Sequence, residues 1–285
     1  MEDLQEALER FRTEGGRTAA RGAATARLAR VPPPIVYSRT KVLDCPEDLL
    51  RRRRIVAGFD RGPFVESYNL LRTQVLHRLR ENGWNVLGVT SPNEREGKTL
   101  TAANLAVSLA MEATQTVLLV DADLRKPGMD RLFGMDKLPG LADVLLDEMP
   151  LEDALVHPGI GRLVVLPGGR AIPRSAETLT SPRMSALVQD LKHRYESRIL
   201  VFDLPPVLTS ADVLAFGPSL DAILIVAGDG VTRRTDVEES IHRLKGAVPI
   251  IGTVLNQVGR EEGSRQTNRV SEAESRRAGG WTDRV

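Results

Sequence analysis

The tripeptide Gly97-Lys98-Thr99 carries the clearest chemistry in the sequence, because it has the form of the end of a phosphate-binding loop. It follows the apolar run WNVLGVTS and opens the helix-like run TLTAANLAVSLAMEA, which is the strand, loop and helix setting that the motif requires. Loop amides and the helix N-terminus would bind phosphate oxygens. Lys98 would reach the β- and γ-phosphates, and the Thr99 hydroxyl would bind Mg²⁺. The tripeptide therefore predicts a site for a nucleoside triphosphate with Mg²⁺.

The loop departs from the usual pattern G-x-x-x-x-G-K-[ST] at its first position, where Pro92 stands in place of glycine. Proline fixes φ at about −65° and has no N–H, so the loop must start in another conformation. No essential donor is lost if the phosphate cradle is formed by residues from 94 onward. The nucleotide-binding residues predicted for this loop are Glu94, Arg95, Glu96, Gly97, Lys98, Thr99 and Leu100.

Three aspartates at the ends of apolar runs belong with this loop. Asp121 and Asp123 end the run VLLVDAD, and their carboxylates lie on the same side because side chains alternate along a strand. Asp203 ends the run ILVFD. Carboxylates at these positions can hold Mg²⁺ or its waters, and one can accept a proton from an attacking hydroxyl. A single strand-end aspartate is more often a turn or capping residue, but three together with a phosphate loop predict chemistry on a phosphoryl group.

The elements that must position these residues begin at residue 84. Short apolar runs alternate there with helical segments, and their apolar residues are consecutive, as is typical of strands covered on both faces. The alternation predicts a P-loop NTPase of the α/β class, with a doubly wound, mainly parallel sheet flanked by helices. The ligand site of such a sheet lies at the carboxyl ends of its strands. The predicted strands are WNVLGVT, TVLLVDAD, RLVVLPGG, RILVFDLP, DAILIVAGD and PIIGTVLNQ.

The chain divides into three parts. Residues 1–50 are predicted to form a short amphipathic helix followed by a linker rich in Gly, Ala, Arg and Pro. Residues 51–257 are predicted to form the nucleotide-binding domain, which begins with the basic run RRRR. Residues 258–285 are polar and charged and are predicted to be a disordered tail. The basic run is typical of a solvated surface, with contact to anionic lipid or an acidic partner as the alternative.

Composition argues against several classes of protein. The single cysteine, Cys45, leaves no disulfide framework or multi-cysteine metal site, which fits a cytosolic compartment. The 285 residues carry a net charge of +1 and 4% aromatic residues, which gives no support for nucleic-acid binding. The four histidines are scattered and show no ligand spacing. No apolar run approaches the length of about 18 residues that a membrane span needs, so we expect no transmembrane segment.

Taken in order, a set of motifs resembles the bacterial tyrosine kinases of capsule and exopolysaccharide synthesis, in particular the soluble cytoplasmic form found with exosortase-type exopolysaccharide clusters. The motifs are VTSPNEREGKTLTAANLAVSLA, TVLLVDADLRKPGMDRLFG, LPGLADVLL, LPGG, ILVFDLPPVLTSADVLAF and GTVLN, and the resemblance covers about residues 50 to 257. It implies an ATP-dependent protein-tyrosine kinase in which Asp121 is the base toward a tyrosine hydroxyl and Asp123 assists at the metal. Asp203 would hold Mg²⁺ through water, and Asn256 would contact the nucleotide base.

The same resemblance implies the cofactors and partners of the protein. The catalytic set is Lys98, Asp121 and Asp123, with ATP as the phosphoryl donor. The Mg²⁺ set is Thr99, Asp121 and Asp203. A membrane protein of the chain-length-determinant type would activate the kinase through its cytosolic tail. A cytoplasmic kinase would thereby be recruited to the inner face of the membrane.

Two features depart from the family pattern. In the oligomerisation motif E-x-x-R-x-x-R, Glu66 and Arg72 match but Asn69 replaces the middle arginine, which leaves assembly into a homo-oligomer open. The family's C-terminal tyrosine cluster is also missing. The tyrosines of this sequence are Tyr37, Tyr68 and Tyr195. Phosphorylation of tail tyrosines is therefore excluded, and Tyr37, in the predicted linker, is the most accessible acceptor among the three.

Two other functions remain open. A switch ATPase of the cell-division and partition type would use water as the nucleophile, and its nucleotide state would control dimerisation. Those relatives carry a signature lysine four residues before the last loop glycine, where this chain has Asn93, which counts against a switch. The second alternative is a non-catalytic regulator that binds ATP and docks on the membrane partner. The complete set of loop and aspartate residues counts against that regulator.

Overall fold

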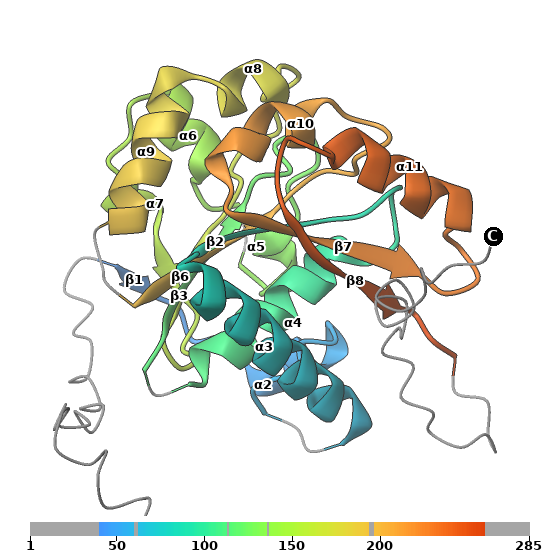
Figure 1. Ribbon diagram of the computed structural model, residues 1–285. Helices are drawn as coiled ribbons and strands as arrows, with labels where there is room; N and C mark the ends of the chain where they lie inside the picture. The colour runs from blue at the N-terminus through green and yellow to red at the C-terminus, as the bar shows by residue number, and fades with distance from the viewer. Residues whose placement is uncertain (1–39, 60–61, 113, 136, 194–196, 260–285) are drawn as a thin grey trace, which may run out of the picture.

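The computed structural model describes residues 40–59, 62–112, 114–135, 137–193 and 197–259. The predicted N-terminal helix, most of the predicted linker and nearly all of the predicted tail lie outside these ranges. Within them, the predicted α/β architecture is confirmed: a mainly parallel sheet lies between layers of helices (Figure 1). No helix in the described ranges combines the length and the apolar character that crossing a membrane requires.

The sheet of the described chain has eight strands in the order β1-β4-β5-β3-β6-β2-β7-β8. Neighbouring strands run parallel, except that β4 and β5 are antiparallel. Strand β6 lies between β3 and β2, so the chain must cross over through helices to return to the centre of the sheet. The strands are β1 (Lys41–Val42), β2 (Val86–Thr90), β3 (Thr116–Asp121), β4 (Val156–His157), β5 (Leu163–Leu166), β6 (Arg198–Asp203), β7 (Ala222–Gly228) and β8 (Ile250–Asn256).

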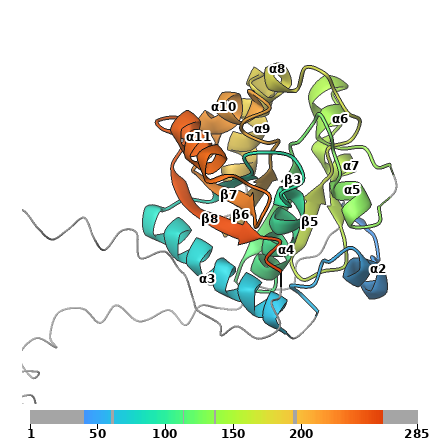
Figure 2. The same ribbon diagram turned by 90° about the vertical axis from the view of Figure 1, so that its right-hand side faces the viewer.

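Helices cover both faces of the sheet (Figures 1 and 2). Helices α2, α3 and α4 lie on one side, and α6, α8, α9, α10 and α11 lie on the other. The helices are α2 (Glu47–Arg52), α3 (Pro63–Asn82), α4 (Lys98–Ala110), α5 (Met129–Leu132), α6 (Leu141–Leu146), α7 (Leu151–Ala154), α8 (Ser175–Leu179), α9 (Pro182–His193), α10 (Asp212–Phe216) and α11 (Arg234–Leu244), with a 3-10 turn at Gly217–Ser219.

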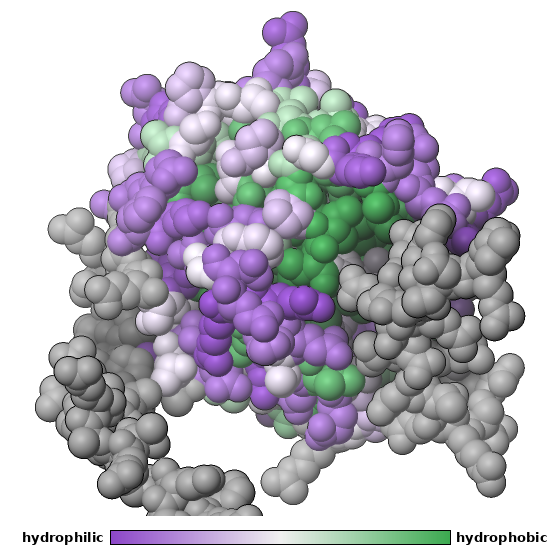
Figure 3. Space-filling view, in the orientation of Figure 1, coloured by the Kyte–Doolittle hydropathy of each residue, from purple (hydrophilic) through white to green (hydrophobic). Residues whose placement is uncertain are grey.

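Strand β3 shows why the predicted strands have consecutive apolar residues. Val117 and Leu119 lie in the core beneath α3 and α4, whereas Leu118 and Val120 lie in the core on the opposite face. Because side chains alternate, a strand that is covered on both faces needs apolar residues at every position. Strand β8 differs from this expectation, since it is the edge of the sheet and its residues are half-buried or exposed. Figure 3 shows apolar side chains at this edge, where Leu255 is 59% exposed.

The regular structure begins before the predicted domain boundary at residue 50. Strand β1 pairs with β4, and α2 places Leu50 in the core with no exposed surface. Ile55, which follows α2, is equally buried. Residues up to 50 were predicted to be linker because a strand of two residues and a helix of six residues carry too little periodicity to detect.

The ends of β2, β3 and β6 are fixed against one another at the centre of the sheet. Asp203 at the end of β6 has Val89 and Asp121 as its register partners on the two neighbouring strands. The Thr90 hydroxyl donates a hydrogen bond of 2.6 Å to the carbonyl of Pro205, just after β6. The phosphate loop leaves β2 at this point, so the loop and the aspartates meet at one edge of the sheet, as predicted for the ligand site.

Candidate nucleotide-binding site

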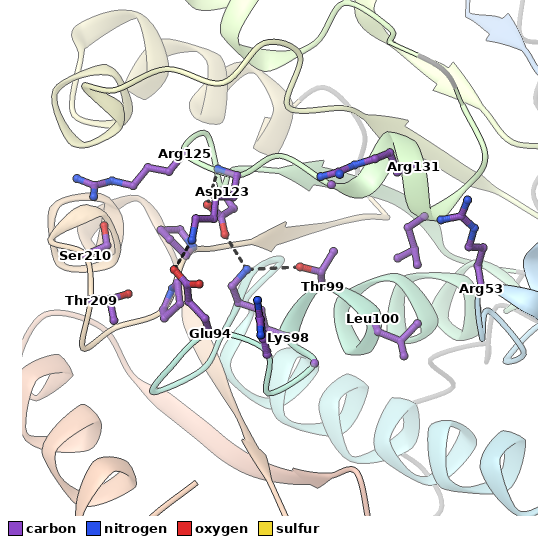
Figure 4. A pocket seen from close by; sticks show the side chains of 17 residues that line it. Arg53, Glu94, Lys98, Thr99, Leu100, Asp123, Arg125, Arg131, Thr209 and Ser210 are labelled. Carbon is purple, nitrogen blue, oxygen red and sulfur yellow. Dashed lines mark hydrogen bonds and ion pairs between the residues drawn. The ribbon is translucent and has the colours of Figure 1, made fainter. Parts of the chain in front are cut away.

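A cavity of about 780 Å³ opens where β2, β3 and β6 end (Figure 4). Most of the predicted nucleotide-binding residues line it together with Asp123: Glu94, Arg95, Gly97, Lys98, Thr99 and Leu100. Four predicted residues do not line it: Glu96, Asp121, Asp203 and Asn256. Several polar residues of the wall were not predicted as site residues from the sequence: Arg53, Arg125, Lys126, Arg131, Thr209 and Ser210. Five of these follow Asp121 or Asp203 closely in the sequence, and that proximity was the available signal. Arg53 follows directly after α2 and belongs to the basic run RRRR, which was interpreted as a solvated surface or a contact to anionic lipid or an acidic partner.

The phosphate loop starts without its first glycine by a specific backbone arrangement. Pro92 is buried, and its carbonyl accepts a hydrogen bond from the segment that follows β6. Farther along, Arg95 and Gly97 have left-handed φ angles of 63° and 93°. A Cβ atom on Gly97 would lie 2.0 Å from Nδ2 of Asn256, so this position needs glycine for its space as well as its conformation. The carbonyl of Arg95 is held by Gln257, whose Nε2 donates to it at 2.8 Å.

Lys98 points into the cavity and pairs with a carboxylate there (Figure 4). Its Nζ lies 2.7 Å from Oδ2 of Asp123 and 3.4 Å from the hydroxyl of Thr99. Burial by itself would lower the pKa of Lys98, but the carboxylates of Asp203, Asp123 and Asp121 together raise it above its ordinary value. Lys98 is therefore a fixed positive charge at the place where the loop would hold the terminal phosphates of a nucleotide.

Asp121 lies behind the cavity wall and is fully buried. Its Oδ2 accepts hydrogen bonds from the backbone N–H groups of Gly128 at 2.8 Å and Met129 at 3.0 Å, at the start of α5. Its Oδ1 accepts one from the N–H of Asp123 at 3.2 Å. Burial, reinforced by the negative charge of Asp203, raises the pKa of Asp121 to about 7. A carboxyl with this pKa can take up a proton near neutral pH.

Asp203 occupies the strand beside Asp121 and is also buried. Burial raises the pKa of Asp203 to about 6, while the charge of Lys98 and a hydrogen bond from Thr99 act in the opposite direction. Its Oδ1 has no hydrogen-bond partner among the described residues. An unpartnered buried oxygen of this kind normally marks a place for water or an ion.

The residues present fit a Mg²⁺ ion that shares its ligands with a nucleotide. No group of three or more His, Cys, Asp or Glu side chains in the described ranges forms a complete metal site. Mg²⁺ does not need one, because it keeps several waters and binds through one or two protein groups plus substrate phosphates. Thr99 and Asp203 would hold such an ion, with the free Oδ1 of Asp203 toward its waters. The ion would supply positive charge to the phosphates.

Glu96 and Asn256 contribute to the shape of the loop. The carboxylate of Glu96 turns away from the cavity and accepts hydrogen bonds from the N–H of Asn93 and the hydroxyl of Thr232. The side-chain amide of Asn256 donates to the carbonyl of Glu96 at 3.0 Å. Motif position alone predicted both residues at the nucleotide, and the sequence carries no signal for contacts to segments so distant in the chain. Contact of Asn256 with the nucleotide base stays a prediction.

Helix α3 carries the residues that match the oligomerisation motif. Arg72 is engaged within the chain: its Nη1 donates to the carbonyl of Ser108 at 3.1 Å, and its Nε lies 3.3 Å from Oε1 of Glu112. Glu66 is exposed and Asn69 is half-buried. Arg72 therefore ties α3 to α4, and a role in assembly would require this arginine to exchange those partners.

A sequence model of the CobQ/CobB/MinD/ParA nucleotide binding domain matches residues 87–280 of the chain. The chain is 32% identical over 192 residues to the tyrosine-protein kinase YwqD of Bacillus subtilis, an alignment that covers 67% of this chain and 80% of YwqD. It is 32% identical over 195 residues to the tyrosine-protein kinase etk of Escherichia coli strain K12. That alignment covers 68% of this chain and 26% of etk, so the chain spans about a quarter of the length of this longer curated relative.

Solved structures of a tyrosine-kinase domain and of a cell-division ATPase both resemble this chain, to different degrees. The kinase domain of the Escherichia coli tyrosine kinase ETK superposes with a TM-score of 0.69 at 28% identity, covering 82% of this chain and 94% of the domain. The septum site-determining protein MinD from Pyrococcus horikoshii, solved with Mg-ADP, superposes with a TM-score of 0.52 at 26% identity, covering 62% and 72%. The chain is therefore more similar to the kinase domain than to this cell-division ATPase.

Proposed function

We propose that this chain, which belongs to the bacterial tyrosine-kinase family within the CobQ/CobB/MinD/ParA nucleotide-binding domains, transfers the γ-phosphoryl group of ATP to a tyrosine hydroxyl. The observation that carries the proposal is the convergence of one lysine and three carboxylates on one end of the cavity. Lys98 and Asp123 form its wall, and Asp121 and Asp203 lie directly behind them. A phosphoryl transfer needs this combination of fixed positive charge and a proton acceptor.

Each residue has a distinct role in the proposed reaction. The loop amides up to Leu100 bind the phosphates, and Lys98 leaves Asp123 to stabilise charge on the β- and γ-phosphates. Asp121 accepts the proton of the acceptor hydroxyl, for which its raised pKa of about 7 is suited; because it lies behind Asp123 without nucleotide, this role requires it to come within hydrogen-bond reach of the hydroxyl when the substrates bind. The amides of Gly128 and Met129 keep the Asp121 carboxylate in one orientation. The acceptor oxygen then attacks the γ-phosphorus while the bond to the β-phosphate oxygen breaks.

The biological setting follows from the family. YwqD and etk are named as tyrosine kinases, and the motif order of this chain resembles the kinases of capsule and exopolysaccharide synthesis. We infer regulation of polymer synthesis and export in a cytoplasmic protein that a membrane partner of the chain-length-determinant type recruits to the inner face of the membrane. Association with an exosortase-type cluster is part of the same inference. The order of motifs in the sequence, rather than the geometry of the site, supports these points.

The acceptor tyrosine is constrained by burial. Tyr68 packs against the core from α3, and burial raises the pKa of its hydroxyl. Tyr37 and Tyr195 lie outside the described residues. From the sequence, Tyr37 is predicted to lie in a linker and to be the most accessible of the three tyrosines. We therefore propose Tyr37, or a tyrosine of another protein, as the acceptor.

Labelled ATP tests the proposal. Purified protein is incubated with γ-labelled ATP and Mg²⁺, with and without the cytosolic tail of the membrane partner, and the labelled residue is mapped. We expect label on tyrosine that disappears in Lys98→Met, is reduced in Tyr37→Phe and is unchanged in Tyr68→Phe. Release of phosphate without labelled protein would instead indicate the switch ATPase. Binding of ATP with neither label nor release would indicate the non-catalytic regulator.

A further inference from the structure

We propose that Glu96 and Thr232 are a positioning pair that holds the phosphate loop in its ATP-binding conformation before the nucleotide arrives. The proposal depends on the binding of ATP in the loop and does not depend on which acceptor receives the phosphate. In this role Glu96 does not bind the nucleotide directly, and Thr232, from the connection between β7 and α11, becomes part of the site.

A buried carboxylate in this loop needs an explanation. Glu96 is 1% exposed and directly precedes Gly97 and Lys98, in the segment that would surround the phosphates. Both the carboxylate and the phosphates are negative, so a glutamate facing the cavity would oppose ATP binding. Glu96 does not line the cavity, and a buried charge persists only when hydrogen bonds satisfy it. Its partners therefore determine what it does.

Three donors from two residues satisfy the Glu96 carboxylate, and the longest of the three hydrogen bonds comes from Nδ2 of Asn93 to Oε1 at 3.4 Å. The N–H of Asn93 donates to Oε2 at 2.8 Å, which closes residues 93 to 96 into a turn. The Thr232 hydroxyl donates to Oε1 at 2.5 Å. The hydroxyl donates in this bond because a carboxylate only accepts, and the same hydroxyl oxygen also accepts the N–H of Gly228 at 2.7 Å. Thr232 thus links the end of β7 to the phosphate loop.

Further contacts hold the same loop from other elements. Nδ2 of Asn93 lies 3.1 Å from Oδ2 of Asp236 in α11. The side chains of Asn256 and Gln257, at the end of β8, donate to the carbonyls of Glu96 and Arg95. These contacts hold residues 93, 95 and 96, which come directly after Pro92 at the position of the usual first glycine. The turn closed by Glu96 supplies the restraint on the backbone at this point.

The function of such a pair is preorganisation. A loop that already has its bound conformation does not lose conformational freedom when the nucleotide binds, and affinity rises accordingly. Removing the pair should therefore weaken ATP binding and raise KM, while kcat at saturating ATP changes little. A residue that only stabilised the fold would lower the melting temperature and leave the affinity of the folded protein unchanged.

Variants of Thr232 distinguish a residue that preorganises the phosphate loop from one that only stabilises the fold. Thr232→Val keeps the shape of the side chain and removes the hydroxyl, whereas Thr232→Ser keeps the hydroxyl. Thr235→Val, at an exposed position of α11, is the matched control. We expect the dissociation constant for ATP to rise about tenfold in Thr232→Val and to stay within about twofold of the parent value in Thr232→Ser and Thr235→Val. Calorimetric titration at a temperature where all variants are folded gives these constants.

A second variant tests the pair itself. Glu96→Gln replaces the carboxylate by an amide of the same shape, and we expect about a tenfold weaker binding of ATP. In the Glu96→Gln background, Thr232→Val should add little, because the two side chains act as a unit. Hydrogen exchange of the amides of residues 93 to 97 in the nucleotide-free protein should accelerate in both variants. Unchanged ATP affinity in both variants, or full additivity of their effects, would overturn the proposal. Since ATP binding is measured directly, loss of kinase activity alone bears only on the proposed function.

Discussion

Asp121 and Asp203 are register partners at the carboxyl ends of the adjacent parallel strands β3 and β6, and both side chains are buried. Burial is the main cause that disfavours ionisation of both carboxyls, and the negative charge of Asp203 adds to this effect at Asp121. The pKa of Asp121 rises to about 7 and that of Asp203 to about 6, from an ordinary value of 3.8. The pair therefore changes its charge in the neutral range, unlike an exposed aspartate.

The acidic limb of the pH profile should reflect this pair. If Asp121 accepts the proton of the acceptor, it must be ionised in the free enzyme, so kcat/KM should rise with pH and level off above about 7. Asp203→Asn removes the neighbouring negative charge, and the pKa of Asp121 should fall. The limb of this less active variant should accordingly move to lower pH. Steady-state rates between pH 5 and 9 measure both profiles, and a limb near pH 4 in the parent protein would contradict a buried base.

The free energy of unfolding of the nucleotide-free protein should depend on pH through Asp121 and Asp203, because ionising these buried carboxyls destabilises the fold. The folded-state pKa values exceed the unfolded value of 3.8, so the stability contribution of the protonated groups is fully present below pH 3.8. It is lost as pH rises through about 6 and 7. Asp203→Asn should therefore stabilise the nucleotide-free fold by about 1 to 2 kcal/mol at pH 8, and the gain should shrink toward pH 5. Urea unfolding at the two pH values measures it, and a destabilised variant at pH 8 would refute the argument.

The sequence predicted the sheet and the elements around the loop because each element has a strong local pattern. Burial of β3 on both faces and the position of Lys98 at the start of α4 follow from such patterns. Three features could not be predicted in this way. Strands β1 and β4 have two residues each, which is too short for a period. The burial of Asp121 depends on how the chain after β3 folds back, so that the N–H groups of Gly128 and Met129 reach its carboxylate, and no period in the sequence reports such a turn. The bond between Glu96 and Thr232 joins residues that tertiary packing brings together across a long separation in the sequence.

Asp123 should restrain Lys98 in the nucleotide-free protein. The two side chains are joined at 2.7 Å, and Lys98 must give up this contact to reach the phosphates. Asp123→Asn weakens the contact, so we expect ATP to bind about fivefold more tightly. We also expect kcat to fall by at least about tenfold, because a carboxylate beside the reacting groups is lost. ATP titration and initial rates measure the two effects separately. Equal losses in affinity and rate would show that Asp123 only maintains the fold of the site.

Asn256 and Gly97 should be coupled through a steric contact. A Cβ atom at Gly97 would lie 2.0 Å from Nδ2 of Asn256, and its φ of 93° is unfavourable for alanine. We expect Gly97→Ala to weaken ATP binding about a hundredfold, from overpacking and backbone strain together. Asn256→Ala alone should weaken binding slightly, since it removes the bond to the carbonyl of Glu96. In the Gly97→Ala background, Asn256→Ala should instead strengthen ATP binding about tenfold, because the clash is relieved while the backbone strain remains. Gly83→Ala, at the end of α3 and away from the cavity, is the control: its φ is 67°, nothing lies within 4 Å of the added Cβ, and it should lower stability without changing ATP affinity. An Asn256→Ala effect of the same sign in both backgrounds would rule out the steric contact.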